Sequence, residues 1–276
     1  MAATVGILGA GRAGLSIGVA LARAGYVVHL HGRRAKPVPP PLTLSTGRLP
    51  AWLSQVDVII LAVPDDAVRA VAADAAGAGL VHRGQVVLHL SGALGREVLS
   101  PLEPSGAALG SLHPLQTLSD PETAPERLRG AVATVVGDPR AVELAAALAR
   151  AVGMEPVPIA AGQKPLYHAA AVVASNFVVT LAGVAQRLFL GAGLTEDAAR
   201  KALAALMAGA VENVRTAGPR VALTGPVARG DVETIRRHLA VLRGEDAELY
   251  RTVSRAALEL ARLDPERRRA IEELLC

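Results

Sequence analysis

Short apolar runs alternate with alanine-rich stretches of helical period through the first 160 residues. Four runs are continuously apolar, as parallel strands covered on both faces tend to be, and they occupy residues 4–8, 27–30, 58–62 and 86–90. We expect helices over residues 13–24, 66–78 and 139–152, and further strands over residues 107–111, 131–136 and 156–159. This alternation predicts an α/β fold with a doubly wound parallel Rossmann sheet.

The period changes near residue 161, after which no strands are expected and long helices follow. The pattern predicts helices over residues 165–191 and 196–217, the second with Thr195 as its N-cap. Two more helices are expected to begin at Asp231 and Asp264.

Residues 168–185 carry no formal charge, and a helix that is apolar all round is buried in a membrane or in a protein core. We interpret them as the central helix of a soluble all-α domain, with a second subunit as a further packing partner. The chain is therefore expected to have two domains. These are a Rossmann-like dinucleotide-binding domain over residues 1–160 and a helical substrate and dimerisation domain over residues 161–276.

Composition narrows the classes of function. Aromatic residues make up only 2% of the chain, which argues against base-stacking platforms for single-stranded nucleic acid. The single cysteine, Cys276, excludes an intrachain disulfide and a cysteine-based metal centre, and we expect no metal site. The net charge is +4, but Arg is interleaved with Asp and Glu, so we expect neither nucleic-acid nor membrane binding. The first residues lack the features of a signal peptide, so we expect a cytoplasmic protein.

A glycine motif, GAGRAG, follows the first predicted strand and opens the first predicted helix. In this context Gly9 permits a tight turn, Gly11 allows the backbone to approach a pyrophosphate, and Gly14 allows the helix to pack closely on the strand. The helix N-terminus, which includes Arg12 and Ala13, presents free amides to the phosphates. The motif predicts dinucleotide binding.

The second predicted strand is followed by Arg33 and Arg34, where an NAD site usually has an acidic residue. Two guanidinium groups suit a 2′-phosphate, so we expect the cofactor to be NADP(H). A solvated arginine pair at a strand end is the structural alternative.

The carboxyl ends of two later strands carry small and polar residues, Val63 and Pro64 after one and Ser91 and Gly92 after the other. Ligands bind at these ends in open α/β sheets, so we expect these residues to contact the cofactor, and Ser91 also the substrate. Ordinary strand-to-loop turns are the structural alternative.

In the second half, Lys164, His168, Ser175 and Asn176 recur close to one helix face. A histidine is the natural proton donor near neutral pH for a carbonyl or imine that receives hydride, and His168 is our candidate. His113 could also take that part, or contact the substrate. For His168 a hydrogen-bonded core histidine is the structural alternative, and for His113 a loop-capping one.

Residues 222–231 form a dense loop ahead of a predicted helix, with Thr224, Arg229 and two glycines. An arginine here could pair with a substrate carboxylate, so we expect Thr224 and Arg229 to bind the substrate. A purely structural turn between helices is the alternative.

The whole chain resembles a family of two-domain bacterial oxidoreductase-like proteins, which have a Rossmann-like NADP-binding domain and a helical C-terminal domain of unknown function. The resemblance rests on the ordered motifs GAGRAG, LAVPDD, HLSGALG, GSLHPLQT, YHAAAVVASN and ALTGPVARGD. The family is similar in plan to pyrroline-5-carboxylate reductases, ketopantoate reductases and β-hydroxyacid dehydrogenases. The resemblance implies NADP binding, a dimer-forming helical domain and an active site between the domains.

The chain departs from the better-known relatives at several functional positions, one of which concerns Lys164. Ketopantoate reductases and β-hydroxyacid dehydrogenases commonly carry a Lys with an Asn four residues later, whereas here Lys164 is followed at that spacing by His168. A catalytic role for Lys164 is therefore held as the alternative to His168.

Together these features predict an NADP(H)-dependent oxidoreductase that transfers hydride to or from a small carboxylate-bearing carbonyl or imine. His168 would donate the proton, Ser91 and Asn176 would polarise the acceptor, and Arg229 would hold the substrate anion. We expect a homodimer formed through the C-terminal helices. The alternative is an NADP(H)-binding sensor or interaction protein without turnover.

Overall fold

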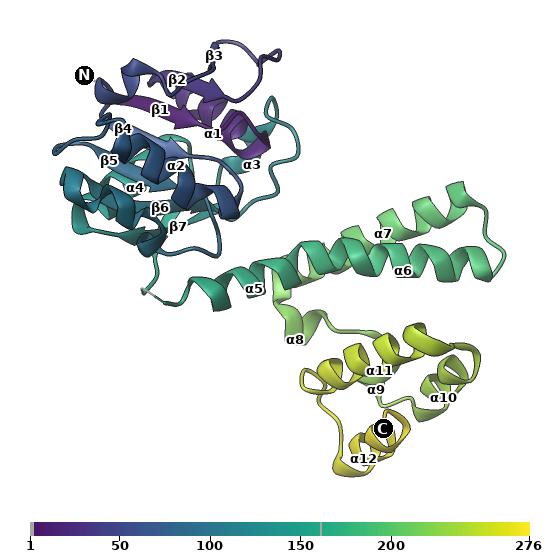
Figure 1. The fold of residues 1–276 in the computed structure, drawn as a ribbon. Coiled ribbons are helices and arrows are strands. Elements are labelled where there is room, and N and C mark those ends of the chain that lie inside the picture. Colours follow the sequence, from purple (N-terminus) through teal and green to yellow (C-terminus); the bar gives the residue numbers. More distant parts are fainter. Residues whose placement is uncertain (1–2, 161) are drawn as a thin grey trace. The chain divides into compact units, whose positions relative to one another are not determined.

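The apolar runs of the first half form one eight-stranded sheet in the order β3-β2-β1-β4-β5-β6-β7-β8 (Figure 1). The structure, a computed structural model, describes residues 3–160 and 162–276. Within them the strands are β1 (Thr4–Leu8), β2 (Val27–Gly32), β3 (Leu44–Thr46), β4 (Val58–Leu61), β5 (Val86–His89), β6 (Ala108–Pro114), β7 (Val132–Gly137) and β8 (Glu155–Pro158). The Rossmann fold class predicted from the sequence is confirmed.

Every strand and helix predicted for this half forms, and the largest error at an end is three residues, at the end of β6. The sheet is parallel except where β6 pairs with β7 in antiparallel register, Gly110 opposite Gly137. A Cβ on Gly137 would lie 2.4 Å from the Cα of Gly110, so the two backbones approach closely there. The hydrophobic pattern does not predict this reversal, nor the short edge strand β3.

Helices cover both faces of the sheet, as the residues of β4 make clear. Val58 and Ile60 belong to a core that includes residues of α1 (Arg12–Arg23) and α4 (Pro139–Ala151). Ile59 and Leu61 belong to a second core, with residues of α2 (Asp65–Gly77) and η2 (Arg96–Ser105). Because successive strand residues point to opposite faces, a strand covered on both sides is apolar throughout. The short elements η1 (Ala51–Ser54) and α3 (Ala124–Leu128) complete this half.

The second half contains only helices among its described residues (Figure 1). They are α5 (Lys164–Ala174), α6 (Asn176–Gly191), α7 (Glu196–Ala217), α8 (Pro219–Ala222), α9 (Gly225–Arg229), α10 (Val232–Val241), α11 (Gly244–Leu258) and α12 (Pro265–Leu274). The predicted N-cap Thr195 forms, and Asp231 and Asp264 cap the helices expected to begin at them. Their side chains accept backbone N–H groups at the starts of α7, α10 and α12. The hydrophobic pattern did not separate α11 from its neighbours.

The expectation of one continuous helix over residues 165–191 is wrong. Ser175 leaves helical geometry, with φ −125° and ψ −69°, and separates α5 from α6. The expected burial of this stretch within the helical domain is also not seen, since α6 buries no residue within the described chain. By length and composition alone, Lys164–Gly191 is the one described stretch that could cross a membrane, and none of its apolar window is buried within the chain.

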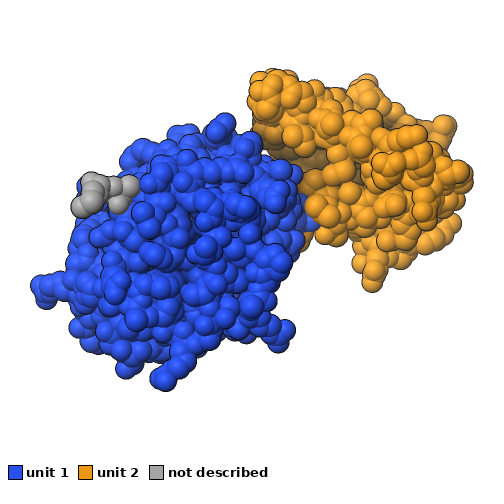
Figure 2. All heavy atoms as spheres, turned by 90° about the horizontal axis from the view of Figure 1, so that it is seen from above, with its two compact units in different colours: residues 1–176 blue, residues 177–276 orange. Residues whose placement is uncertain are grey.

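The chain divides into two compact units, Met1–Asn176 and Phe177–Cys276, shown in Figure 2. Helix α5 therefore belongs to the same unit as the sheet. The boundary expected between residues 160 and 161 involves residue 161, which lies outside the described residues.

Candidate functional site

The glycine motif forms the turn between β1 and α1, and its three glycines meet different surroundings. Gly9 has φ +120°, and a Cβ there would lie 2.2 Å from the carbonyl oxygen of Ala62. A Cβ on Gly14 would lie 1.9 Å from the carbonyl oxygen of Gly9, so this glycine allows the helix to approach the turn. A Cβ on Gly11 would meet nothing within 4 Å, which leaves its backbone open to a ligand. The loop therefore fits a pyrophosphate at the N-terminus of α1, where Arg12 is exposed and Ala13 half-buried.

Arg33 and Arg34 are exposed and directly follow β2. The edge strand β3 lies beside that end, with Ser45 opposite His31 and Thr46 opposite Gly32. His31 Nδ1 lies 3.0 Å from Ser45 Oγ, and burial lowers the pKa of His31. The two guanidinium groups thus follow the carboxyl end of β2, at the edge of the sheet where β2 pairs with β3.

The carboxyl ends of β4 and β5 meet through Ser91. Its hydroxyl donates a hydrogen bond of 2.8 Å to Asp65 Oδ2, at the start of α2, directly after Val63 and Pro64. The same oxygen accepts the N–H groups of Ala93 and Leu94 at 3.2 and 3.0 Å. Because a serine has one hydroxyl proton, that of Ser91 is committed to Asp65 in this arrangement.

Lys164 is the largest fully buried side chain, with a relative exposure of 1%. Its Nζ donates to the carbonyl oxygen of Ser91 at 2.5 Å and to Ser111 Oγ at 3.2 Å. Burial lowers the pKa of Lys164 to about 8, against the opposing effect of the negative charges of Asp65 and Glu97. A lysine with this pKa exchanges a proton readily near neutral pH.

Two imidazoles converge on the backbone of Gly92. A Cβ there would lie 2.3 Å from His168 Nδ1 and 2.8 Å from His113 Nε2, so only glycine fits without displacing a ring. The ring centroids of His113 and His168 are 5.9 Å apart, and His113 Nδ1 lies 2.8 Å from Tyr167 Oη. Among the described residues, the buried His168 Nδ1 has no hydrogen-bond partner.

Two buried histidines of the first unit, His89 and His113, have lowered pKa values and are held largely neutral. Burial, followed by the positive charge of Lys164, lowers the pKa of His113 to about 4. The same two causes lower the pKa of His89 to about 4. His89 has no exposed surface; its Nε2 lies 3.0 Å from the carbonyl oxygen of Gly95, and its Nδ1 accepts the Ser91 N–H at 3.2 Å. His89 therefore holds the backbone of the Ser91 turn through hydrogen bonds at both ring nitrogens.

The first unit thus brings together five predicted site residues, from the turn after β5, from β6 and from α5: Ser91, Gly92, His113, Lys164 and His168. Asn176 is exposed at the start of α6, and Ser175 is half-buried. Thr224 and Arg229 are both exposed and lie in the other unit, at the two ends of α9.

The site also contains four residues that were not among the predicted site residues: Asp65, His89, Ser111 and Tyr167. Tyr167 could have been found from its spacing, since it lies three residues after Lys164 on the same helix face. His89 and Ser111 sit within strands and carry no such signal.

Two family models match the chain. A Rossmann-like domain matches residues 2–114, and a domain of unknown function, DUF2520, matches residues 131–257. These matches confirm the resemblance inferred from the sequence motifs: the chain joins a Rossmann-like domain to a DUF2520 domain. A comparison with curated proteins finds no match.

The fold is shared with solved structures of low sequence identity. A protein from Thermotoga maritima is 23% identical with a TM-score of 0.70, and 94% of this chain and 98% of that chain are covered. A Bacteroides fragilis protein described as an NADP oxidoreductase is 21% identical with a TM-score of 0.71, again over 94% and 98%. The pyrroline carboxylate reductase of Plasmodium falciparum, solved with NADP bound, is 13% identical with a TM-score of 0.59, over 99% and 95%.

Proposed function

Because this chain joins a Rossmann-like domain to a DUF2520 domain, we propose that it is an NADP(H)-dependent oxidoreductase. Its reaction would transfer hydride to or from a small carbonyl or imine that bears a carboxylate. The observation that carries the proposal is the buried Lys164, which meets Ser91 at the same sheet edge as the glycine turn. Parallel strands β1, β4, β5 and β6 end at that edge, where ligands bind in open α/β sheets.

The cofactor would be held by residues that already have suitable geometry. The open backbone at Gly11 accommodates a pyrophosphate, and Arg33 and Arg34 suit a 2′-phosphate. Val63, Pro64 and Gly92 would line the nicotinamide end. When bound, the nicotinamide supplies or accepts the hydride. The NADP in the structurally similar reductase supports this choice of cofactor.

The protein would supply the proton and fix the acceptor. We assign the proton donor to His168, whose ring lies against Gly92, and the polarisation of the acceptor to Lys164, two of whose N–H groups are held by Ser91 and Ser111. The Ser91 hydroxyl already donates to Asp65, so it acts by holding the turn and not by polarising the acceptor. Asn176, Thr224 and Arg229 remain candidates for substrate contacts.

The test is oxidation of NADPH, followed by absorbance, with a panel of 2-keto acids and cyclic imines. We expect turnover with at least one compound of the panel. His168→Ala should lower kcat about 100-fold while leaving NADPH affinity nearly unchanged. Retained turnover in His168→Ala would assign the proton to Lys164 or His113. Tight NADPH binding without oxidation across the panel would instead favour a cofactor-binding sensor.

We also propose that the protein is a cytoplasmic homodimer formed through its C-terminal helices. Helix α6 and its N-terminal neighbour α5 expose Leu166, Val173, Phe177 and Val179, which need a cover. A bilayer is disfavoured because Lys164, at the start of this stretch, is tied to the sheet. Light scattering should give a dimer mass, and Val179→Glu should give a monomer; a monomeric parent protein would contradict the proposal.

A further inference from the structure

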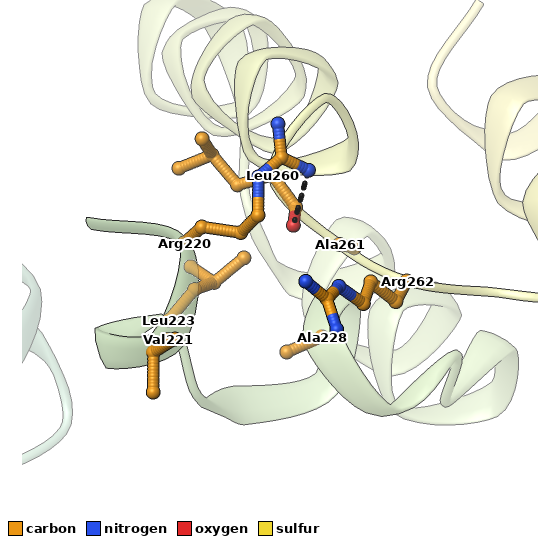
Figure 3. A pocket seen from close by; sticks show the side chains of 7 residues that line it. All are labelled: Arg220, Val221, Leu223, Ala228, Leu260, Ala261 and Arg262. Carbon is orange, nitrogen blue, oxygen red and sulfur yellow. Dashed lines mark hydrogen bonds between the residues drawn. The ribbon is translucent and has the colours of Figure 1, made fainter. Parts of the chain in front are cut away.

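A small hollow of about 220 Å³ lies within the second compact unit, among α8, α9 and the segment after α11 (Figure 3). Arg220 extends from α8 and Arg262 from the segment that follows α11, and both side chains reach the same hollow. Its remaining lining is apolar and includes Val221, Leu223 and Ala228. Two exposed arginines thus line one hollow whose other side chains are apolar.

Neither guanidinium has a carboxylate partner among the described residues. Arg220 makes one long hydrogen bond, 3.4 Å from its Nη1 to the carbonyl oxygen of Leu260, and no hydrogen bond of Arg262 is found in the described part of the chain. Each guanidinium carries five N–H donors, so most of them are available to a ligand.

The two acids nearest in sequence to the lining segment 260–262, Glu259 and Asp264, are engaged elsewhere. Glu259 pairs with Arg268, which also binds Glu272. Asp264 accepts the backbone N–H groups of Glu266 and Arg267 and caps α12. Neither of these two carboxylates forms an ion pair with Arg220 or Arg262.

From the sequence, anion binding was expected at Arg229 in the adjacent loop. Arg229 is exposed and is not part of the lining of the hollow, although Leu223 and Ala228 on the same loop segment are. The two arginines that line the hollow lie instead at positions 220 and 262, 42 residues apart. Two like charges that share a hollow are stabilised by an anion placed between them.

We propose that this hollow binds a small molecule with at least two anionic groups, carboxylate or phosphate, on a short apolar stem. Guanidinium forks pair bidentately with either group, and the apolar wall accommodates the stem. The proposal goes beyond the oxidoreductase function, because the hollow lies wholly in the second unit and its occupation needs neither nicotinamide nor turnover.

The experiment is calorimetric titration of the full-length protein with citrate and with pyrophosphate, at low ionic strength and without NADPH. We expect saturable binding of at least one of them. Arg220→Gln and Arg262→Gln should each weaken it about fivefold, and the double variant about 25-fold, as expected for solvent-exposed charge pairs. Arg262→Lys, which keeps the charge but loses the fork, should weaken it less than Arg262→Gln.

The matched control is Arg236→Gln, which removes the same charge from an exposed ion pair in the same unit, away from the hollow. Its affinity should stay within about twofold of the parent protein. Stronger binding of citrate than of pyrophosphate would identify a polycarboxylate site, and the reverse a phosphate site. The proposal is overturned if neither anion binds, or if both bind the double variant as tightly as the parent, since that binding would belong to the phosphate loop.

Discussion

Gly11→Ala should separate cofactor binding from folding more cleanly than any other substitution in the glycine motif. A Cβ at Gly11 would meet nothing within 4 Å, and the residue has φ −70° and ψ 179°, which alanine adopts without strain. The methyl group would nevertheless stand where a pyrophosphate approaches the backbone. Gly11→Ala should therefore leave the free energy of unfolding nearly unchanged and weaken NADPH binding.

The expected changes in the free energy of unfolding and in NADPH affinity follow from the surroundings of Gly11 and Gly14. Gly→Ala at compatible angles restricts the unfolded chain, and alanine is a slightly poorer N-cap, so the free energy of unfolding should stay within about 1 kcal/mol of the parent. Displacing the pyrophosphate would lose about one charge-assisted hydrogen bond, roughly 2 kcal/mol, which corresponds to an affinity about 30-fold weaker. Gly14→Ala is the contrasting variant, because its Cβ would lie 1.9 Å from a backbone oxygen, and it should lose about 3 kcal/mol or more.

The assays are urea denaturation for stability and fluorescence titration for NADPH affinity. Gly11→Ala should match the parent in urea denaturation but bind NADPH more weakly in the fluorescence titration. Gly14→Ala should be less stable than the parent in urea denaturation. If Gly11→Ala bound NADPH with unchanged affinity, the pyrophosphate would not lie on this loop. If Gly11→Ala were as unstable as Gly14→Ala, the folded protein would not have open space for a Cβ at Gly11.

Three further predictions concern cofactor choice, acid stability and the sheet. Replacing Arg33 and Arg34 with Ala should weaken NADPH binding much more than NADH binding in parallel titrations, and equal losses would contradict the 2′-phosphate assignment. Because burial lowers the pKa of His89 from 6.5 to about 4, the unfolded chain takes up a proton between these values that the folded chain does not, so stability falls as pH falls through this window. This contribution is about 3 kcal/mol, and His89→Gln should flatten urea-denaturation free energies measured from pH 6.5 to 4; an unchanged slope would argue against it. Asp138 holds Arg96 at 2.7 Å and accepts a backbone N–H of β6, so Asp138→Asn should lower the free energy of unfolding by about 1–3 kcal/mol in the same assay, and no loss would show the contact to be unimportant.

Those parts of the site that depend on residues close together in the sequence were predictable. The glycine turn follows a strand and opens a helix, and Lys164 and His168 lie four residues apart, so spacing alone places each group on one surface. The partners of these residues were not predictable in the same way. Lys164 contacts Ser91 from 73 residues away, and His113 contacts Tyr167 from 54. Those contacts depend on strand order, which periodicity does not encode.

One assignment changed for a reason visible only in three dimensions. Ser91 was expected to polarise the acceptor, but its hydroxyl donates a hydrogen bond to Asp65, because the ends of β4 and β5 lie side by side. The hydroxyl group suits the expected chemistry, and its neighbours decided which atoms remain available.

The sequence by itself determined the α/β order of the first half, the all-helical second half and the glycine turn between β1 and α1, because each depends on periodicity or on angles within a few residues. Only the tertiary structure decided that β6 and β7 run antiparallel and that Lys164 is buried among histidines. It also decided that α6 buries no residue within the chain. Burial and charge environment are properties of packed neighbours, and a chain acquires them only when distant segments meet.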